Sequence, residues 1–176
     1  MAYNYVIDET ITEVGYLTEP VSVDEAKAYA RVEATSVAQD ALFALWISSA
    51  RQIIEQMTGL SLVPKSIVAE ISNWQGNMEV PYGPVSNTIT WLDANGNVPT
   101  VILEGNKFPR VTVPIGYLKA TYLAGYTNDS IPRELKIAIL NQIVSWYENR
   151  GDEATLNMPA SVVTICQKYS RIGLIM

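Results

Sequence analysis

Apolar residues in the first third of the chain recur at the spacing of an α-helix. Ser22 and Glu25 have the positions of a capping box, so a short helix is predicted from there to about Val32. A longer apolar pattern from about Val37 to Met57 predicts a second helix, and Gly59 follows it as a typical helix end. Two helices are therefore expected in this part of the chain.

The second predicted helix is apolar on two neighbouring faces. One face carries Leu42, Leu45, Ser49, Ile53 and Met57. The other carries Phe43, Ile47, Ala50 and Ile54. A helix that packs only on its own core needs one apolar face. Two interpretations stay open, in which both faces belong to the core or one of them meets a partner.

The middle of the chain has the pattern of strands and turns, with β-branched and aromatic residues in short runs between glycines and prolines. The clearest alternation places Ile67, Ala69 and Ile71 on one face of a strand. Residues 88–92 predict a second strand, and Asn95-Gly96 predicts a tight hairpin with positive φ. Residues 108–113 are expected to pair with residues 117–124 across a Pro-Ile-Gly turn.

Helical spacing returns in the last third of the chain, where helices are predicted from Pro132 to about Arg150 and from Pro159 onward. The apolar face of the first comprises Leu135, Ala138, Ile139, Gln142, Ile143 and Trp146. An α+β fold follows, with about four helices and an antiparallel β section inserted between the second and third main helices. We expect a single domain over residues 1–176, with helical segments at 20–60 and 130–170, a β section at about 65–125 and a C-terminal tail at 170–176.

The composition restricts the function more than the fold. The 176 residues are 48% hydrophobic and 17% charged, a balance typical of a globular protein. The 12 Lys and Arg residues against 18 Asp and Glu residues give a net charge of −6, which disfavours tight binding to nucleic acid or to an anionic membrane. Histidine is absent, which excludes the Ser-His and Cys-His pairs of most hydrolases and the usual transition-metal ligand.

The sequence has no pattern of export or membrane insertion. Cys166 is the only cysteine, so no intramolecular disulfide can form and synthesis in a reducing cytoplasm is expected. The N-terminal segment lacks the basic and apolar regions of a signal peptide. No apolar run reaches the roughly 18 residues that would predict a membrane span.

One segment partly matches a calcium-binding loop. Asp93, Asn95, Asn97 and Glu104 fall at positions 1, 3, 5 and 12 of that template. Val98 replaces the glycine that the sharp bend requires, and no helices are predicted beside the segment. The Asn-Gly turn already explains these residues. A metal-assisted hydrolase that uses Asp93 and Glu104 is therefore the weaker hypothesis.

Two other groups of reactive side chains have a structural interpretation. Glu148, Asp152 and Glu153 cluster with Arg150 at a predicted helix end, where subunit or fold contacts explain them without catalysis. Cys166 lies on an apolar stripe with no histidine to activate it and is predicted to be a buried thiol. Nucleotide-binding glycine loops, nucleophile elbows and zinc motifs are absent from the sequence. No catalytic, cofactor or metal site is assigned.

Three blocks of sequence together match a known pattern. They are SVDEAKAYARV with ALFALWISSARQIIEQMTGLSLVPKS, then YGPVSNTITWLDANGN, then YLKATYLAGYTNDSIPRELKIAILNQIVSWYENRGD. They contain a capped helix, a long helix with a Thr-Gly end, a proline-led strand and hairpin, a Gly-Tyr turn and a Trp-Tyr-Glu-Asn-Arg helix end. Over about residues 20–152 the chain resembles the head-tail connector proteins of long-tailed bacteriophages, also called adaptor or head-completion proteins.

The resemblance implies a structural protein of the virion neck, with no enzymatic activity. It implies a homo-oligomeric ring, commonly of twelve copies, that docks under the portal protein, extends the DNA channel and provides a platform for the next neck or tail protein. Genomic DNA would pass through without specific binding, which an acidic lumen favours. The alternative is another ring of the neck or tail, such as a tail terminator.

The resemblance also gives two sets of candidate contacts. The candidate subunit or fold contacts are Trp146, Tyr147, Glu148 and Arg150. The candidate portal contacts are Tyr169, Arg171, Ile172, Leu174 and Ile175. The apolar tail that holds most of the second set follows the last predicted helix, where a free apolar terminus usually docks or frays.

Overall fold

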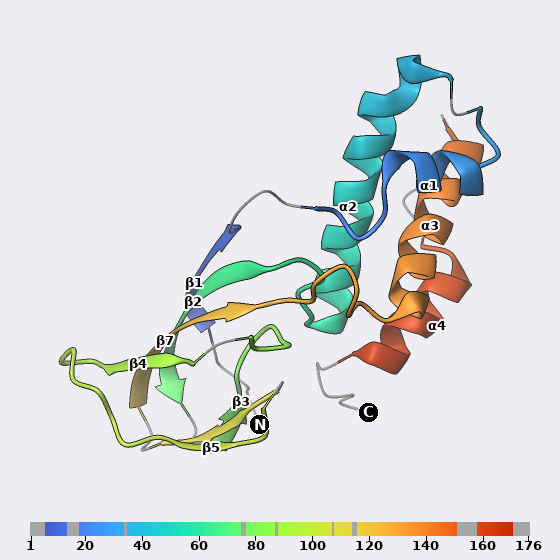
Figure 1. Cartoon of the computed structure of the whole chain (residues 1–176). Helices are drawn as coiled ribbons and strands as arrows, with labels where there is room; N and C mark the ends of the chain where they lie inside the picture. The colour runs from blue at the N-terminus through green and yellow to red at the C-terminus, as the bar shows by residue number, and fades with distance from the viewer. Residues whose placement is uncertain are drawn as a thin grey trace. The chain divides into compact units, whose positions relative to one another are not determined.

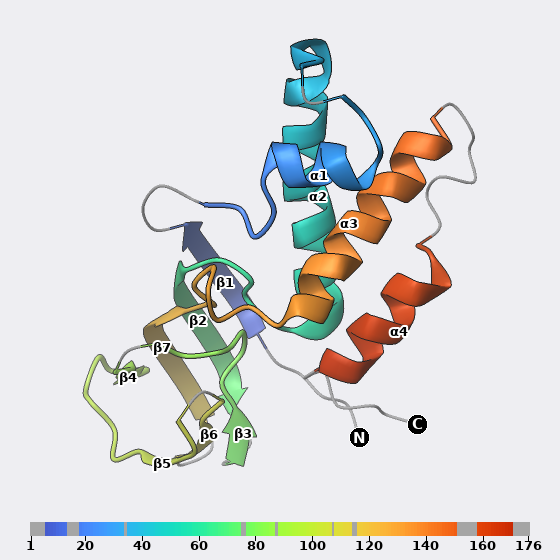
Figure 2. The same cartoon turned by 45° about the vertical axis from the view of Figure 1, so that its right-hand side comes forward.

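The computed structural model describes residues 6–13, 18–33, 35–74, 77–86, 88–106, 108–113, 116–150 and 158–170. The chain divides into two compact units, one of residues 1–17 and 63–126 and the other of residues 18–62 and 127–176. The first, the β unit, holds the strands, and the second, the helical unit, holds the helices (Figures 1 and 2). The α+β class and the position of the β section between the second and third main helices are confirmed. The single connector domain stays a prediction.

The β unit contains two antiparallel sheets. The larger has the strand order β1-β2-β7-β4 and the smaller β3-β6-β5. The strands are β1 Val6–Glu13, β2 Lys65–Trp74, β3 Asn77–Glu79, β4 Thr90–Asp93, β5 Ile102–Glu104, β6 Arg110–Thr112 and β7 Gly116–Ala124. The long strands β2 and β7 form the centre of the larger sheet, with Ile67 opposite Tyr122 and Ala69 opposite Ala120.

The core of the β unit follows the predicted alternation of β2. Ile67, Ala69 and Ile71 are all buried, as a strand with one inward face requires. The buried residues that complete this core are Val80, Ile89, Trp91, Val111, Val113, Leu118, Ala120, Tyr122 and Ala124. Both sheets therefore contribute to one core.

One predicted hairpin is wrong, and a second is present only as a tight turn. Strand β6 pairs with β3 and β5 in the smaller sheet, so residues 108–113 do not pair with residues 117–124. Strand β7 already has β2 on one edge and β4 on the other, which leaves no edge for β6. The turn at Asn95-Gly96 is present and is closed by the Asp93 amide, which donates to the carbonyl oxygen of Asn97 at 2.8 Å, but the strand ladder of β4 is formed with β7. Of these two turn residues, only Gly96 has a positive φ.

The helical unit comprises α1 Val23–Tyr29, the 3-10 helix η1 Val37–Gln39, α2 Asp40–Thr58, α3 Arg133–Glu148 and α4 Ala160–Tyr169. In Figure 2 α3 lies between α2 and α4, and it contacts both helices. Phe43, Ile47, Ala50 and Ile54 of α2 are buried, and so are Leu135, Ala138, Ile139 and Ile143 of α3. None of the helices in the described part of the chain is long and apolar enough to cross a membrane.

The helix ends show which local signals determine them. The capping box is confirmed, because the Glu25 amide donates to Ser22 Oγ at 3.1 Å and the Ser22 amide donates to Glu25 Oε2 at 2.8 Å. Helix α1 ends before the predicted Val32, because Arg31 adopts a φ of 58°. Gly59, with a φ of 68°, ends α2 as predicted. Pro132 and Pro159 each precede their helix as the N-cap residue.

Helix α3 ends at Glu148, short of the predicted Arg150. The Asn149 side chain donates to the carbonyl oxygen of Ser145 at 2.8 Å, and the Asn149 amide donates to the same carbonyl at 3.2 Å. The backbone bond is the last of the α3 ladder, because Asn149 is the C-cap residue and Arg150 lies in the turn that follows.

A buried ion-pair network connects α2 to the segments beside it. The Arg51 side chain is only 2% exposed, and its Nε and Nη2 donate to the two carboxylate oxygens of Glu19 at 2.8 and 3.2 Å. Its Nη1 donates to Glu55 Oε2 at 2.8 Å, and Glu55 Oε1 accepts the Leu62 amide at 2.7 Å. One guanidinium therefore fixes the entry to this unit and the end of α2.

Candidate functional site

The face of α2 that carries Leu42 and Leu45 is only partly buried within the helical unit. Leu45 is 60% exposed. The other members of that face, Leu42, Ser49, Ile53 and Met57, are half-buried. Phe43 and Ile47, on the other apolar face, are fully buried. Of the two interpretations of this helix, the described residues favour a core face beside a face with exposed apolar area.

An aromatic cluster joins this exposed face to α3. The Phe43 ring centroid lies 5.5 Å from that of Trp46 and 5.7 Å from that of Tyr147. The rings of Trp46 and Tyr147 meet edge to face, with centroids 6.4 Å apart. Such geometry is favourable for aromatic pairs and holds the rings in fixed orientations. Trp46 is thereby positioned at the surface by a buried neighbour.

Arg150 adds a cation to the edge of this cluster. Its guanidinium carbon lies 4.1 Å from the centroid of the Tyr147 ring and 5.9 Å from that of Trp46. Its Nε donates to the carbonyl oxygen of Tyr147 at 3.0 Å. Stacking on two rings orients the guanidinium while its side chain remains exposed.

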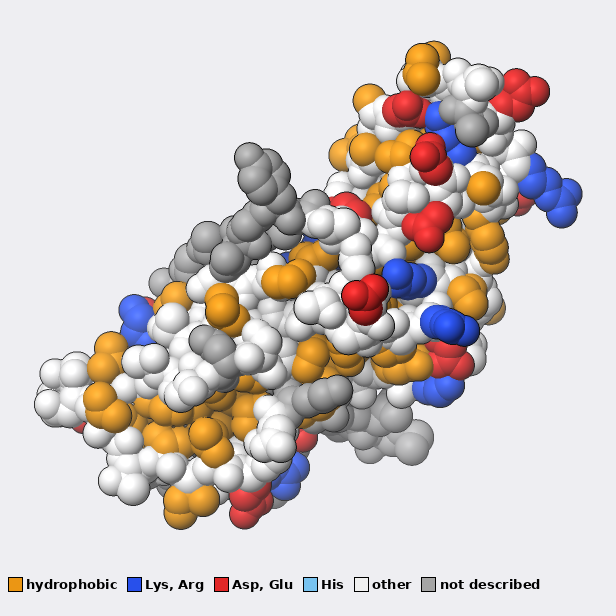
Figure 3. Space-filling model, in the orientation of Figure 1, with side chains coloured by type: hydrophobic (Ala, Val, Ile, Leu, Met, Phe, Trp, Pro, Cys, Tyr) orange, Lys and Arg blue, Asp and Glu red, His pale blue; other side chains and the backbone are white. Residues whose placement is uncertain are grey.

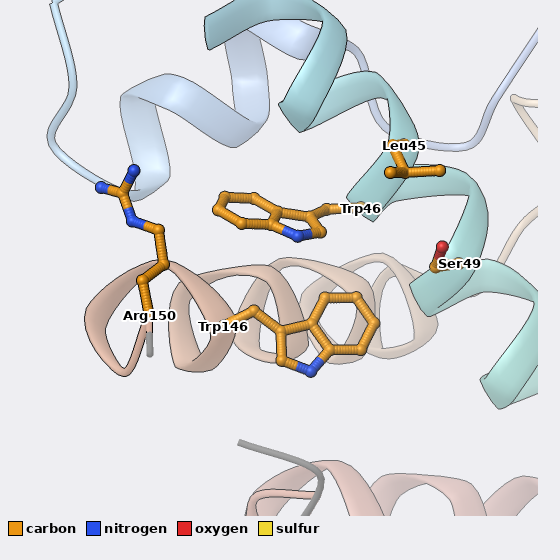
Figure 4. Close-up of a pocket in the computed structure, with 5 residues that line it drawn as sticks. All are labelled: Leu45, Trp46, Ser49, Trp146 and Arg150. Atoms are coloured by element: carbon orange, nitrogen blue, oxygen red, sulfur yellow. The ribbon is translucent and has the colours of Figure 1, made fainter. Parts of the chain in front are cut away.

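These side chains surround a surface pocket of about 350 Å³. Its lining residues, which we call the α2–α3 patch, are Leu45, Trp46, Ser49, Trp146 and Arg150. In Figure 4 the indoles of Trp46 and Trp146 project from facing helices, with Arg150 at one end and Leu45 and Ser49 at the other. Aromatic walls with one cation suit apolar side chains that carry a nearby carboxylate. The lining includes no base that could activate the Ser49 hydroxyl.

The structure brings together three of the four candidate contacts named from the sequence. Trp146 and Arg150 line the patch, and Tyr147 packs beneath it. Glu148 is exposed and does not line the patch. Their role as subunit contacts stays a prediction. Trp46 was not predicted as a site residue, because its partners on α3 lie about a hundred positions away and leave no local signal in the sequence.

Tyr169, the one candidate portal contact within the described residues, bonds to its own chain. Its hydroxyl donates to Glu134 Oε2 at 2.6 Å, and Lys168 Nζ contacts both Glu134 oxygens at 2.7 Å. These hydrogen bonds, with that of Lys168 the largest, hold the pKa of the Glu134 carboxyl below its usual value. They connect the end of α4 to the start of α3. The remaining candidates, Arg171, Ile172, Leu174 and Ile175, lie outside the described residues.

Asp93 has a structural role in the turn after β4. Its Oδ1 accepts the amides of Asn95 and Asn97, each at 2.8 Å. These bonds, that from the Asn97 backbone first, lower the pKa of the Asp93 carboxyl. Glu104, the other half of the hydrolase hypothesis, lies on β5 in the other sheet. The described residues contain no cluster of three or more His, Cys, Asp and Glu side chains suited to a metal ion.

The other candidate reactive residues of the sequence are Cys166 and the carboxylates near the end of α3. Cys166 is buried as predicted, and desolvation raises the pKa of its thiol to about 11, so the thiol stays protonated at neutral pH. Glu148 is exposed at the end of α3, while Asp152 and Glu153 lie outside the described residues.

The overall fold matches chains of known structure from gene transfer agent particles. A chain from the neck of an empty particle aligns with a TM-score of 0.70 and 21% identity, over 92% of this chain and 95% of that one. No family model matches the sequence. No curated protein matches it either. The fold is therefore one that is also found in gene transfer agent particles, and the likeness at this identity concerns the fold.

Two further structures agree with the first. A chain from the virion of the native gene transfer agent aligns with a TM-score of 0.66 and 20% identity, over 92% of this chain and 95% of that one. A chain from the neck of the native particle, computed with twelvefold symmetry, aligns with a TM-score of 0.60 and 21% identity, over 89% of this chain and 95% of that one. Each alignment includes residues of both units and nearly the whole of the other chain.

Proposed function

We propose that this protein is a structural adaptor in the neck of a phage or phage-like particle. Copies of the chain form a ring under the portal, extend the DNA channel and offer a platform for the next neck or tail protein. The observation that carries the proposal is the agreement of fold with a neck chain over 92% of this chain and 95% of the other. The alignment includes residues of both the β unit and the helical unit, which supports a similar role in the neck.

The surface of the helical unit supports a ring of identical subunits. The α2–α3 patch exposes an apolar side chain and two half-buried indoles beside a cation, which is a typical composition for the centre of a protein interface. A patch that meets a different surface on the next copy generates a ring when the rotation closes. We propose a ring of twelve copies, in line with the resemblance.

The charge of the chain supports passage of DNA without binding. Each copy carries a net charge of −6, so a ring of copies carries a large net negative charge. Like charge repels phosphate and prevents the counterion release that drives nucleic-acid binding. The role proposed is structural, with no catalysis, and the partners are other copies, the portal, a downstream neck or tail protein and the DNA that passes through.

The C-terminal residues are proposed to contact the portal. Helix α4 ends at Tyr169, whose hydroxyl fixes it to Glu134 on α3. The residues that follow carry Ile172, Leu174 and Ile175 within a short apolar segment. A firmly attached helix end would present this segment to a partner in the virion neck.

The experiment is removal of this protein from the phage or prophage that encodes it, followed by electron microscopy of the particles. The adaptor role predicts DNA-filled heads separated from complete tails, and supply of the protein in trans restores joined particles. Joined and complete particles in the absence of the protein would contradict the proposal. Heads without tails that have also lost the portal would contradict it too, because the adaptor acts after the portal.

A further inference from the structure

Strand β5 of the β unit exposes an apolar edge. It is an outer strand of the smaller sheet, and its residues Ile102 and Leu103 are 59% and 47% exposed. Figure 3 shows hydrophobic side chains gathered over the part of the β unit where β4 and β5 lie. An exposed apolar edge strand favours contact with another chain, and natural proteins usually cover it.

The two faces of β5 differ in chemistry. Because side chains alternate along a strand, Ile102 and Glu104 project to one side and Leu103 to the other. Leu103 lines a separate depression in the β unit. Arg110 lies opposite Glu104 in the register, but its guanidinium approaches Glu79 at 3.9 Å. Of the described cations, none forms an ion pair with Glu104. One side of β5 thus presents an aliphatic side chain beside a carboxylate.

The α2–α3 patch has the complementary composition. Leu45 and the two tryptophans offer apolar walls, and Arg150 offers a stacked guanidinium that pairs with no carboxylate of the described residues. When Ile102 is buried against the indoles, β5 can lie across the patch in either direction, and only one direction brings Glu104 to the end of the patch that holds Arg150. The opposite charges then set the orientation of the contact.

We propose that the α2–α3 patch of one copy binds the Ile102 and Glu104 side of β5 in the next copy. This inference rests on the proposed ring and names its contact. Two patches facing each other would bring two Arg150 cations together, and two β5 strands would bring two Glu104 carboxylates together. Each self-pairing is therefore disfavoured, and the contact is heterologous, as a ring requires.

Cysteine cross-linking tests the contact, because the native Cys166 is buried. Two singly substituted proteins, Leu45→Cys and Ile102→Cys, are mixed, assembled with or without the portal protein, and oxidised. The contact predicts a disulfide between one copy of each. The control replaces Leu45→Cys by Val37→Cys, because Val37 is 72% exposed on η1 outside the patch. Little cross-linking is expected from that pair.

The outcomes separate this inference from the proposed function. Rings that form while Leu45→Cys and Ile102→Cys cross-link no better than the control overturn the contact and leave the adaptor role standing. Absence of any oligomer, with the portal present or absent, overturns both. Cross-linking well above the control supports both.

A charge exchange provides a second test that does not depend on disulfide geometry. Arg150→Glu and Glu104→Arg should each weaken ring assembly by about tenfold or more, because each places like charges at the contact. The double variant restores an opposite pair and should assemble better than either single variant. Circular dichroism checks that each variant folds. A folded double variant that assembles worse than both single variants overturns the contact.

Discussion

At the scale of single residues, Gly125 has the most demanding position in the β unit. Its φ is +126°, and a Cβ placed there would lie 2.1 Å from the carbonyl oxygen of Val63. Its amide donates to the carbonyl oxygen of Pro84 at 2.8 Å. Three backbone segments therefore meet at a point that has room for hydrogen alone. The Gly-Tyr turn seen in the sequence has this steric origin.

Gly125→Ala is expected to lower the free energy of unfolding by about 2 to 5 kcal/mol, the sum of backbone strain and steric overlap. Gly116→Ala is the matched control, since Gly116 also has a positive φ, of +143°, but nothing lies within 4 Å of its Cβ. It should cost about 1 to 3 kcal/mol. Urea denaturation of both variants gives the comparison, and equal losses would show that the overlap is relieved by a small backbone shift.

Arg51 makes a second prediction at this scale. Arg51→Met keeps much of the volume but leaves Glu19 and Glu55 without their cation, so unfolding free energy should fall by about 3 to 5 kcal/mol. Lys119→Met is the control, because its ion pair with Glu70 at 2.6 Å lies near the surface and is screened by water. Thermal and urea unfolding would measure both. A loss at Arg51 no larger than at Lys119 would contradict the structural role of the network.

Local signals in the sequence determined residues whose partners are near in the chain. Ser22 and Glu25, Gly59 and Asp93 act within a few positions and were predicted correctly. The ion pair of Arg51 with Glu19 was not predicted, because Glu19 is 32 positions away. The same limit applies to the patch, where Trp46 and Trp146 meet only after α2 and α3 pack. The periodicity of α2 revealed an extra apolar face but not what lies beside it.

At the scale of elements, helices were predicted better than strand pairings. A helix is defined by contacts three and four positions apart, whereas strands pair across long separations. Strand β1 shows the difference, since Ile11 lies opposite Ile67. Its run of β-branched residues indicates a strand but not which strand it pairs with. The sequence gives no signal that β6 pairs with β3 while β7 pairs with β2, because both segments simply have the pattern of strands.

The contact between α3 and α4 predicts a pH dependence. Hydrogen bonds from Lys168 and Tyr169 lower the pKa of the Glu134 carboxyl from its usual value of 4.5. The stability that these bonds add to the fold is therefore complete above pH 4.5 and is lost as the pH falls through the lowered pKa. The wild type should melt at a higher temperature than Glu134→Gln above about pH 4.5, and the difference should vanish in more acidic solution. Melting temperatures between about pH 3 and 7 test this. A difference that persists at the lowest pH would contradict the linkage.

The C-terminal segment gives a prediction at the same scale. Deletion of residues 171–176 is expected to leave the fold intact and to abolish docking to the portal, since these residues follow α4 and belong to none of the predicted core faces. A variant with Ile172, Leu174 and Ile175 replaced by serine should behave in the same way. Binding to immobilised portal and melting temperature are the two measurements. A sharp fall in melting temperature would show that the segment is part of the core.

At the scale of the whole molecule, the interpretation rests on agreement between independent features. The sequence resembles head-tail connectors over about residues 20–152, and the fold matches neck chains of gene transfer agents over nearly the full chain. The helical unit exposes an aromatic patch with a cation, and the β unit exposes an aliphatic edge with a carboxylate. A protein with two such surfaces is suited to head-to-tail assembly.

The most direct test of the ring is the native mass of the purified protein, alone and mixed with its portal protein. We expect a species of about twelve times the 19.4 kDa of one chain, either free or assembled on the portal. A chain that is monomeric alone and joins the portal in that number would indicate templated assembly. A chain that stays monomeric and does not bind the portal would contradict the adaptor role.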